Sequence, residues 1–144
     1  MTLPPGLVLS VEDRPAEADV DVLPAGLHAY NDEQWLGHQP WHPLGVFLRQ
    51  DGVVVAGLSG GSYAGWLAIR YLWIAEPWRR LRLGSRLVRE AERWAVAGGS
   101  HSAMVDTFSF QAPGFYRRQG YQEYARLDYP PRRERIFFRK RLLA

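Results

Sequence analysis

The chain has 144 residues, 47% hydrophobic and 23% charged, which predicts a single globular domain and excludes disordered and fibrous classes. The absence of cysteine excludes disulfides, thiolate metal sites and cysteine nucleophiles, and fits a reducing compartment. A net charge of +3 does not require a nucleic-acid partner. Neither a signal peptide nor a membrane-spanning run of ~18 apolar residues is found. We therefore expect one cytoplasmic domain over residues 1–144 with no membrane partner.

The N-terminal part predicts a strand, a helical segment and a loop. Residues 7–13 (LVLSVED) have the apolar character of a first strand. Residues 17–33 have mixed helical character, and Pro24 is expected to interrupt that helix. Residues 34–43 contain two prolines and a glycine and predict a loop.

Three apolar segments follow, and their order predicts an antiparallel meander. Residues 44–49 and 53–60 read as strands joined by a tight turn at 51–52, where Asp-Gly favours positive φ. A second turn is predicted at 59–62 (SGGS), before a long strand at 63–75.

After Gly84 the spacing of apolar residues changes from every second residue to every third or fourth residue, which predicts an amphipathic helix. The glycines 98–99 are expected to end this helix. Its apolar positions are Leu87, Val88, Ala91, Trp94 and Ala95. A strand is expected at 103–110, so that strand, helix and strand form a crossover unit.

The C-terminal part predicts a short helix over 111–120 and a hairpin of two strands, residues 121–127 and 133–142. The basic stretch 132–141 reads as a partly exposed edge strand protected by its charges. The alternative is a surface for nucleic acid or an acidic protein. Together the segments predict a mixed sheet covered by helices.

Residues 78–92 (WRRLRLGSRLVREAE) connect the long strand to the amphipathic helix through a basic loop. A helix N-terminus leaves about four backbone N–H groups unpaired and favours anions. The loop has the single glycine Gly84, and the sequence contains neither the P-loop pattern nor a GxGxxG dinucleotide pattern. Either it binds a phosphate or it merely connects two elements.

Two stretches, LWIAEPWRRLRLGSRLV (72–88) and VDTFSFQAPGFYRRQGY (105–121), resemble the GNAT superfamily of N-acetyltransferases. The resemblance runs from about residue 44 to the end. It implies an α/β fold: a mixed, mostly antiparallel sheet of six to seven strands flanked by about four helices. It also implies acetyl-CoA as co-substrate, no metal, and acetyl transfer to a primary amine of a small molecule or peptide by direct attack in a ternary complex.

In that family a Gln/Arg-x-x-Gly-x-Gly/Ala loop binds the pyrophosphate, and the strand before it pairs with the pantetheine arm. The resemblance implies these cofactor-binding residues: Leu72, Trp73, Ile74, Arg79, Arg80, Leu81, Arg82, Leu83, Gly84, Ser85, Ser109 and Ala112. Arg82 replaces the usual first glycine, which we expect to be tolerated if its φ stays negative. Arg80 or Arg82 could then pair with a phosphate. Ser109 stands where many members have asparagine.

The same resemblance implies that Tyr116 protonates the departing thiolate, because a phenol with a pKa of ~10 keeps its proton at neutral pH. The amine must also lose a proton, directly or through water. Asp106 is the first candidate for this general base, with Glu76 and His101 as alternatives.

The acceptor pocket is expected to include Asn31, Trp35 and Trp41, whose aromatic faces could hold a cationic amine. The acceptor stays open among a polyamine, an amino acid, an antibiotic and a protein N-terminus. A non-catalytic acyl-CoA-binding or nucleic-acid-binding module on the same fold is the alternative function. Edge strands and surplus aromatic residues make a homodimer reasonable, and no ligand cluster predicts a metal site.

Overall fold

The computed structural model describes residues 2–143. The chain divides into two compact units, Met1–Gly37 and His38–Ala144. We call them the N-terminal unit and the sheet unit, and we describe each by itself.

The N-terminal unit contains one helix, α1 (Glu17–Gln34). Pro24 lies inside it and does not interrupt it, although its ring removes one helical hydrogen bond. Acidic residues in the first turn favour the helix through its dipole. The strand predicted at 7–13 is wrong, because these residues form no strand. Apolar alternation alone does not make a strand when the backbone has no ladder partner.

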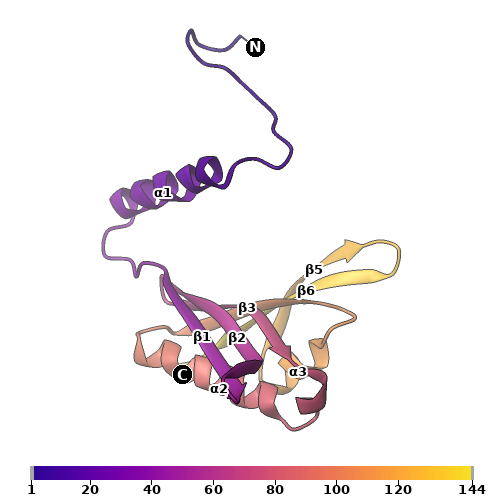
Figure 1. The fold of residues 1–144 in the computed structure, drawn as a ribbon. Coiled ribbons are helices and arrows are strands. Elements are labelled where there is room, and N and C mark those ends of the chain that lie inside the picture. Colours follow the sequence, from indigo (N-terminus) through magenta and orange to yellow (C-terminus); the bar gives the residue numbers. More distant parts are fainter. Residues whose placement is uncertain (1, 144) are drawn as a thin grey trace. The chain divides into compact units, whose positions relative to one another are not determined.

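The sheet unit contains a six-stranded sheet in the order β1-β2-β3-β4-β6-β5 (Figure 1). The strands are β1 (His42–Gln50), β2 (Val53–Tyr63), β3 (Trp66–Ile74), β4 (Ser102–Phe108), β5 (Gln122–Tyr129) and β6 (Arg133–Arg141). All neighbours are antiparallel except β3 and β4. The predicted mixed α/β fold is confirmed. The described residues form three α-helices rather than about four, and one 3-10 turn, η1 (Glu76–Trp78).

Two tight turns shape the meander. The turn at Asp51 and Gly52 is confirmed, with φ of 50° and 81°. The turn predicted at 59–62 is wrong, because these residues lie within β2 and the chain reverses at Ala64 and Gly65. The glycines of β2 serve close approach instead of turning, since a Cβ on Gly60 would collide with the Ala68 carbonyl of β3.

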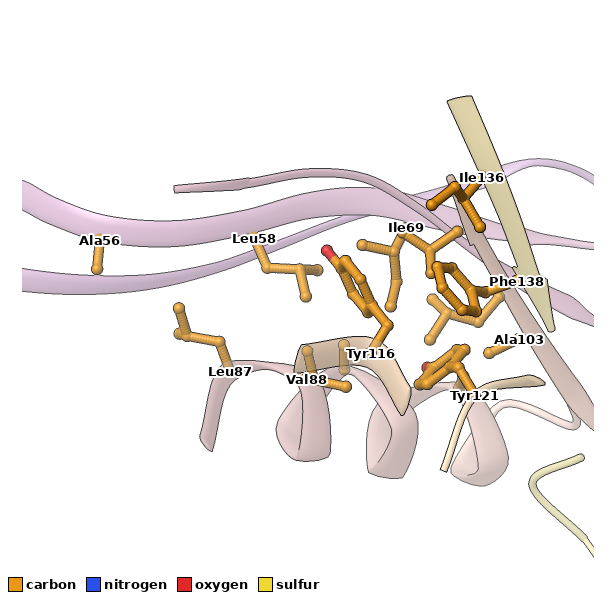
Figure 2. Packing of buried hydrophobic residues seen from close by; sticks show 14 residues of the cluster. Ala56, Leu58, Ile69, Leu87, Val88, Ala103, Tyr116, Tyr121, Ile136 and Phe138 are labelled. Atoms are coloured by element: carbon orange, nitrogen blue, oxygen red, sulfur yellow. The ribbon is translucent and has the colours of Figure 1, made fainter. Parts of the chain in front are cut away.

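Helix α2 (Leu83–Ala97) covers one face of the sheet, as its apolar period predicted. Its buried side chains meet those of β2 and β3 and of the short helix α3 (Pro113–Arg118) in one core. Figure 2 shows Leu87, Val88 and Tyr116 pointing from the two helices toward the same strands. This face of the sheet is therefore closed by helices on either side of the β3–β4 boundary.

Strand β6 is central and not an edge strand, so that prediction is wrong. It pairs with β4 along all of β4 and with β5 on its other side. Ile136 and Phe138 are 2% and 0% exposed, because they point into the core while the basic residues alternate with them. The strand itself is confirmed, and its charges made an interior strand look like an edge strand. The edges of the sheet are β1 and β5.

Candidate active site

The sheet opens where β3 and β4 separate. The two strands pair only from Trp66 and Ser102 to Ile69 and Val105. On the other side of β3 the register with β2 shifts, which leaves Arg70 as an extra residue between Ile69 and Tyr71. A bulge of this kind bends a strand and ends regular pairing. We call the resulting opening the notch.

A first cavity of about 450 Å³ occupies the notch. Its wall comes from the end of β3, the loop before α2, the end of β4 and helix α3. The lining residues are Arg70, Tyr71, Leu72, Trp73, Ile74, Arg79, Gly84, Asp106, Thr107, Gln111, Ala112, Phe115 and Tyr116. The fold therefore brings eight of the predicted site residues together: Leu72, Trp73, Ile74, Arg79, Gly84, Asp106, Ala112 and Tyr116.

A second cavity of about 540 Å³ lies at the N-terminus of α2. Its lining residues are Ile74, Arg80, Arg82, Leu83, Gly84, Ser85, Phe115, Arg118 and Gln119. Three arginines, Arg80, Arg82 and Arg118, thus line a cavity at the first turn of a 15-residue helix. The unpaired amides and the helix dipole favour an anion at this position, and the arginines add charge-assisted donors.

The loop before α2 has left-handed backbone geometry at two arginines. Arg82 has a φ of 60° and a ψ of 22°, and Arg80 has a φ of 66°. The condition of a negative φ at Arg82 is therefore not met. The chain keeps the geometry that a glycine favours, at a cost of roughly 1–2 kcal/mol per residue. Arg79 anchors the loop, because its Nε donates to the Ile74 carbonyl at 2.9 Å.

Gly84 allows the helix to begin close to its neighbours. A Cβ at this position would lie 3.2 Å from the ring of Phe115 and 3.5 Å from Ile74 Cδ1. A side chain here would press on Phe115 and Ile74, which line the first and second cavities together with Gly84. The backbone at Gly84 therefore fits the phosphate cradle that acetyl-CoA requires.

Tyr116 is 6% exposed and its hydroxyl points toward the sheet (Figure 2). Burial, together with the nearby charge of Asp106, raises the pKa of its phenol to about 12. The rings of Phe115, Tyr121 and Phe138 lie 5.1 to 6.0 Å from it and fix its position. Tyr116 can therefore hold a proton in the first cavity at any physiological pH.

Asp106 lies on β4 at the notch, and Arg135 on the neighbouring strand β6 orients its carboxylate. The Nε of Arg135 donates to its Oδ2 at 2.7 Å, and this contact raises the pKa of the Arg135 guanidinium. Among the described residues no donor is bonded to Oδ1. The alternative bases lie elsewhere: Glu76 begins η1, and the Nδ1 of His101 is 2.8 Å from Ser102 Oγ. Neither of them lines the first cavity.

A third cavity of about 640 Å³ shares Arg70, Tyr71, Asp106 and Gln111 with the first. Its remaining lining residues are Ala68, Ile69, Met104, Val105, Phe108, Tyr124, Arg135 and Phe137. Trp41 lies beside Arg70, whose guanidinium is 4.4 Å from the centre of its ring. Asn31 and Trp35 belong to the N-terminal unit, and their part in acceptor binding stays a prediction.

Two predicted cofactor residues lie away from these cavities. The Ser109 hydroxyl accepts the backbone N–H of Glu134 at 3.0 Å, and Leu81 is 58% exposed. Other lining residues were not predicted, among them Arg70, Gln111 and Phe115. A charged residue in the middle of an apolar strand was a signal for Arg70. No comparable signal in the sequence points to Gln111 or Phe115.

Within residues 2–143 no helix is long and apolar enough to cross a membrane. The same residues contain no group of three or more His, Asp or Glu side chains placed to hold a metal ion.

Comparison with known proteins agrees with this fold. Residues 11–121 match the acetyltransferase (GNAT) family. The blasticidin-S acetyltransferase of Streptomyces morookaense is 43% identical over 95 residues, which are 62% of this chain and 70% of that protein. An acetyltransferase of Agrobacterium fabrum is 31% identical over 96 residues, 66% of this chain and 69% of that protein. The crystal structure of an acetyltransferase from Bacillus cereus superposes with a TM-score of 0.79 and 29% identity, covering 92% of this chain and 97% of that one.

The fold and the site thus define an acyl-transferring enzyme, and the chain belongs to the GNAT family of acetyltransferases. It is an acetyl-CoA-dependent acetyltransferase. This favours the enzyme over the non-catalytic binding module.

Proposed function

We propose that the chain transfers the acetyl group of acetyl-CoA to a primary amine of a small molecule by direct attack in a ternary complex. The observation that carries the proposal is that the first and third cavities meet at the notch and share Arg70, Tyr71, Asp106 and Gln111. A donor on one side and an amine on the other would meet there. The match to a blasticidin-S acetyltransferase supports a small-molecule acceptor over a peptide.

The proposed binding site for acetyl-CoA consists mainly of main-chain groups. The edge of β3 that faces β4 has no ladder partner after Ile69 among the described residues, so its main-chain groups are available to an extended pantetheine arm. The first turn of α2 with Arg80 and Arg82 would hold the phosphates. Bound acetyl-CoA supplies the activated acetyl group as a thioester. Leu81 and Ser109 line neither cavity, and they are included only because of their positions in the family pattern.

Two side chains of this protein would transfer protons, one as a base and one as an acid. Asp106 accepts a proton from the ammonium form of the acceptor at its carboxylate, which Arg135 orients through Oδ2. The freed amine attacks the acetyl carbon and the C–S bond breaks, and Tyr116 donates its phenolic proton to the leaving thiolate at a buried position. The new amide nitrogen then releases its remaining extra proton, which restores the phenol of Tyr116. The raised pKa of Tyr116 keeps this proton in place until it is needed.

Three further expectations belong to this proposal. The family match crosses the boundary between the two units, which supports one catalytic domain over residues 1–144. The absence of cysteine supports a cytoplasmic location. The exposed Phe47 on the edge strand β1 supports a homodimer. Light scattering coupled to size-exclusion chromatography would measure the mass in solution.

The test is thiol release from acetyl-CoA with a panel of primary amines, on wild type and on Asp106→Asn. The asparagine keeps an oxygen for Arg135 but is not a base. We expect kcat/KM to fall by about 100-fold or more, with acetyl-CoA binding unchanged by calorimetry. Asp128→Asn, on the exposed strand β5, is the matched control and should behave as wild type. Full activity of Asp106→Asn would contradict the role of Asp106, and no amine-dependent thiol release would contradict the function.

A further inference from the structure

The third cavity has an excess of positive charge. Its charged lining residues are Arg70, Asp106 and Arg135. Asp106 and Arg135 pair with each other at 2.7 Å, so their charges offset one another. Arg70 forms no ion pair with any carboxylate of residues 2–143. Arg70, which lines this cavity, therefore brings a positive charge without a carboxylate partner to the space in which the acceptor would lie.

Arg70 is held in place by its surroundings. It is the extra residue of the β3 bulge, and its guanidinium lies 4.4 Å from the centre of the Trp41 ring. Trp41 in turn packs on β2, because Gly61 has no side chain and a Cβ there would come within 2.5 Å of Trp41 Cη2. Stacking leaves the edge of a guanidinium, with its N–H groups, free to bind. The contact with Trp41 therefore holds the guanidinium in place while its N–H groups stay available to donate hydrogen bonds.

Four aromatic side chains also line the third cavity. Phe108, Tyr124 and Phe137 line it together with Tyr71. Tyr124 and Phe137 lie 6.3 Å apart between ring centres, on the neighbouring strands β5 and β6. Such a wall binds the apolar or planar body of a ligand and leaves orientation to the few charged groups.

We infer that the acceptor is an amine that also carries a carboxylate, with the amine at Asp106 and the carboxylate on Arg70. This rests on the proposed function, because it assumes that the third cavity receives the acceptor. A planar guanidinium binds a carboxylate through two parallel hydrogen bonds, which fixes the distance between the two ends of the ligand. A polyamine fits poorly, because each added ammonium would meet the positive field of Arg70. Among the acceptors open from the sequence, this selects the amino-acid type.

The test uses matched acceptors that differ only in the anionic group. The probes are 3-amino-3-phenylpropanoate and 4-aminobutanoate, the primary amide of each, and spermidine. With wild type, we expect each acid to exceed its amide by at least about tenfold in kcat/KM, a ratio that corresponds to 1.4 kcal/mol of discrimination. Spermidine should be the poorest acceptor.

Variants at Arg70 then assign the preference to that side chain. In Arg70→Gln the ratio of acid to amide should fall to near one through a rise in KM for the acid, whereas Arg70→Lys should keep part of it. Arg49→Gln is the matched control: Arg49 also lies over a ring, that of Phe47 at 5.1 Å, but lines none of the three cavities. It should keep the full ratio.

The outcomes distinguish an error in the acceptor class from an error in the proposed function. Acetyl transfer to amides or spermidine at least as fast as to acids, or an unchanged ratio in Arg70→Gln, would overturn the acceptor class and leave the acetyltransferase proposal standing. Acetyl-CoA binding without turnover of either acid would also overturn the class. A protein that does not bind acetyl-CoA would overturn the proposed function itself.

Discussion

The two sides of the notch use different kinds of groups. The proposed donor side uses main-chain groups: the unpaired edge of β3 and the first turn of α2. The proposed acceptor side uses side chains, above all Arg70, Asp106 and Arg135. A main-chain site depends on backbone geometry and tolerates changes such as arginine at position 82. A side-chain site determines which acceptor fits, and each residue in it matters individually.

The largest effect is expected from filling the main-chain cradle with a side chain. In Gly84→Trp the indole would occupy the space beside Phe115 and Ile74, where even a Cβ lies at 3.2 and 3.5 Å. Acetyl-CoA binding, measured by calorimetry, should become undetectable while acceptor-side residues stay intact. Gly84→Ala is the graded control and should lose only part of the affinity.

Thermal unfolding and circular dichroism would establish that both Gly84 variants fold, because Gly84 is buried. A folded Gly84→Trp protein that binds acetyl-CoA as tightly as wild type would show that the donor does not lie at the start of α2.

The next effect is expected at Tyr116, which lines the first cavity. Tyr116→Phe keeps the buried ring and removes only the acidic proton, so kcat should fall by about 100-fold while the affinity for acetyl-CoA changes little. Steady-state thiol release and calorimetry measure the two quantities. An unchanged kcat would assign the proton to water or to another group.

The same substitution has a consequence for stability at high pH. Burial raises the pKa of Tyr116 to about 12, whereas the phenol of the unfolded chain loses its proton near pH 10. The unfolded state then binds fewer protons, so the stability linked to Tyr116 is complete below pH 10 and is lost between pH 10 and 12. Denaturant unfolding should show wild type losing stability faster than Tyr116→Phe in this window. Parallel curves for the two proteins would contradict the raised pKa.

A smaller, more local effect is expected from disturbing the acceptor wall. In Gly61→Ala the new methyl group would lie 2.5 Å from Trp41 Cη2 and 2.6 Å from the His42 carbonyl oxygen. Overpacking of this kind costs about 1–3 kcal/mol in the free energy of unfolding. Because Trp41 supports Arg70, the KM for the acceptor should rise several-fold, with acetyl-CoA affinity unchanged.

Gly57→Ala is the matched control on the same strand. Its Cβ would lie 3.0 Å from Phe47 Cδ1, away from Trp41, so it should lower stability without changing the acceptor KM. An equal rise in KM for both variants would mean that Gly61 acts through general stability and not through the Trp41–Arg70 stack.

The difference between the two sides also explains which site residues could be predicted from the sequence. The donor side follows from local patterns: a strand, a basic loop, one glycine and an amphipathic helix. Leu72 and Ile74 lie in the notch as the family pattern implies. The acceptor side depends on register, because Arg70 reaches it through a bulge and Arg135 through the pairing of β6 with β4. Register between distant strands is not visible in local sequence.

The errors in the fold have the same origin. Residues 7–13 have a strand pattern but no partner strand, and the glycines at 60–61 look like a turn but allow the close approach of Trp41 and β3. The basic stretch of β6 looked exposed because its central position depends on β4 and β5. In each case the local residues permit two structures, and contacts that are distant in sequence select one.

The smallest effect is expected where the main-chain side departs from the family pattern, at Arg82. Arg82→Gly would relieve the left-handed strain at φ 60° but add flexibility to the unfolded chain, so the net change in stability should stay within about 1 kcal/mol. Loss of the charge should weaken acetyl-CoA binding by about fivefold, less at high salt. Arg82→Asn, which also accepts left-handed geometry, should match Arg82→Gly if charge alone matters. A loss of more than about 100-fold in either variant would mean that the donor is held mainly by this side chain, and the contrast between a main-chain side and a side-chain side would fail.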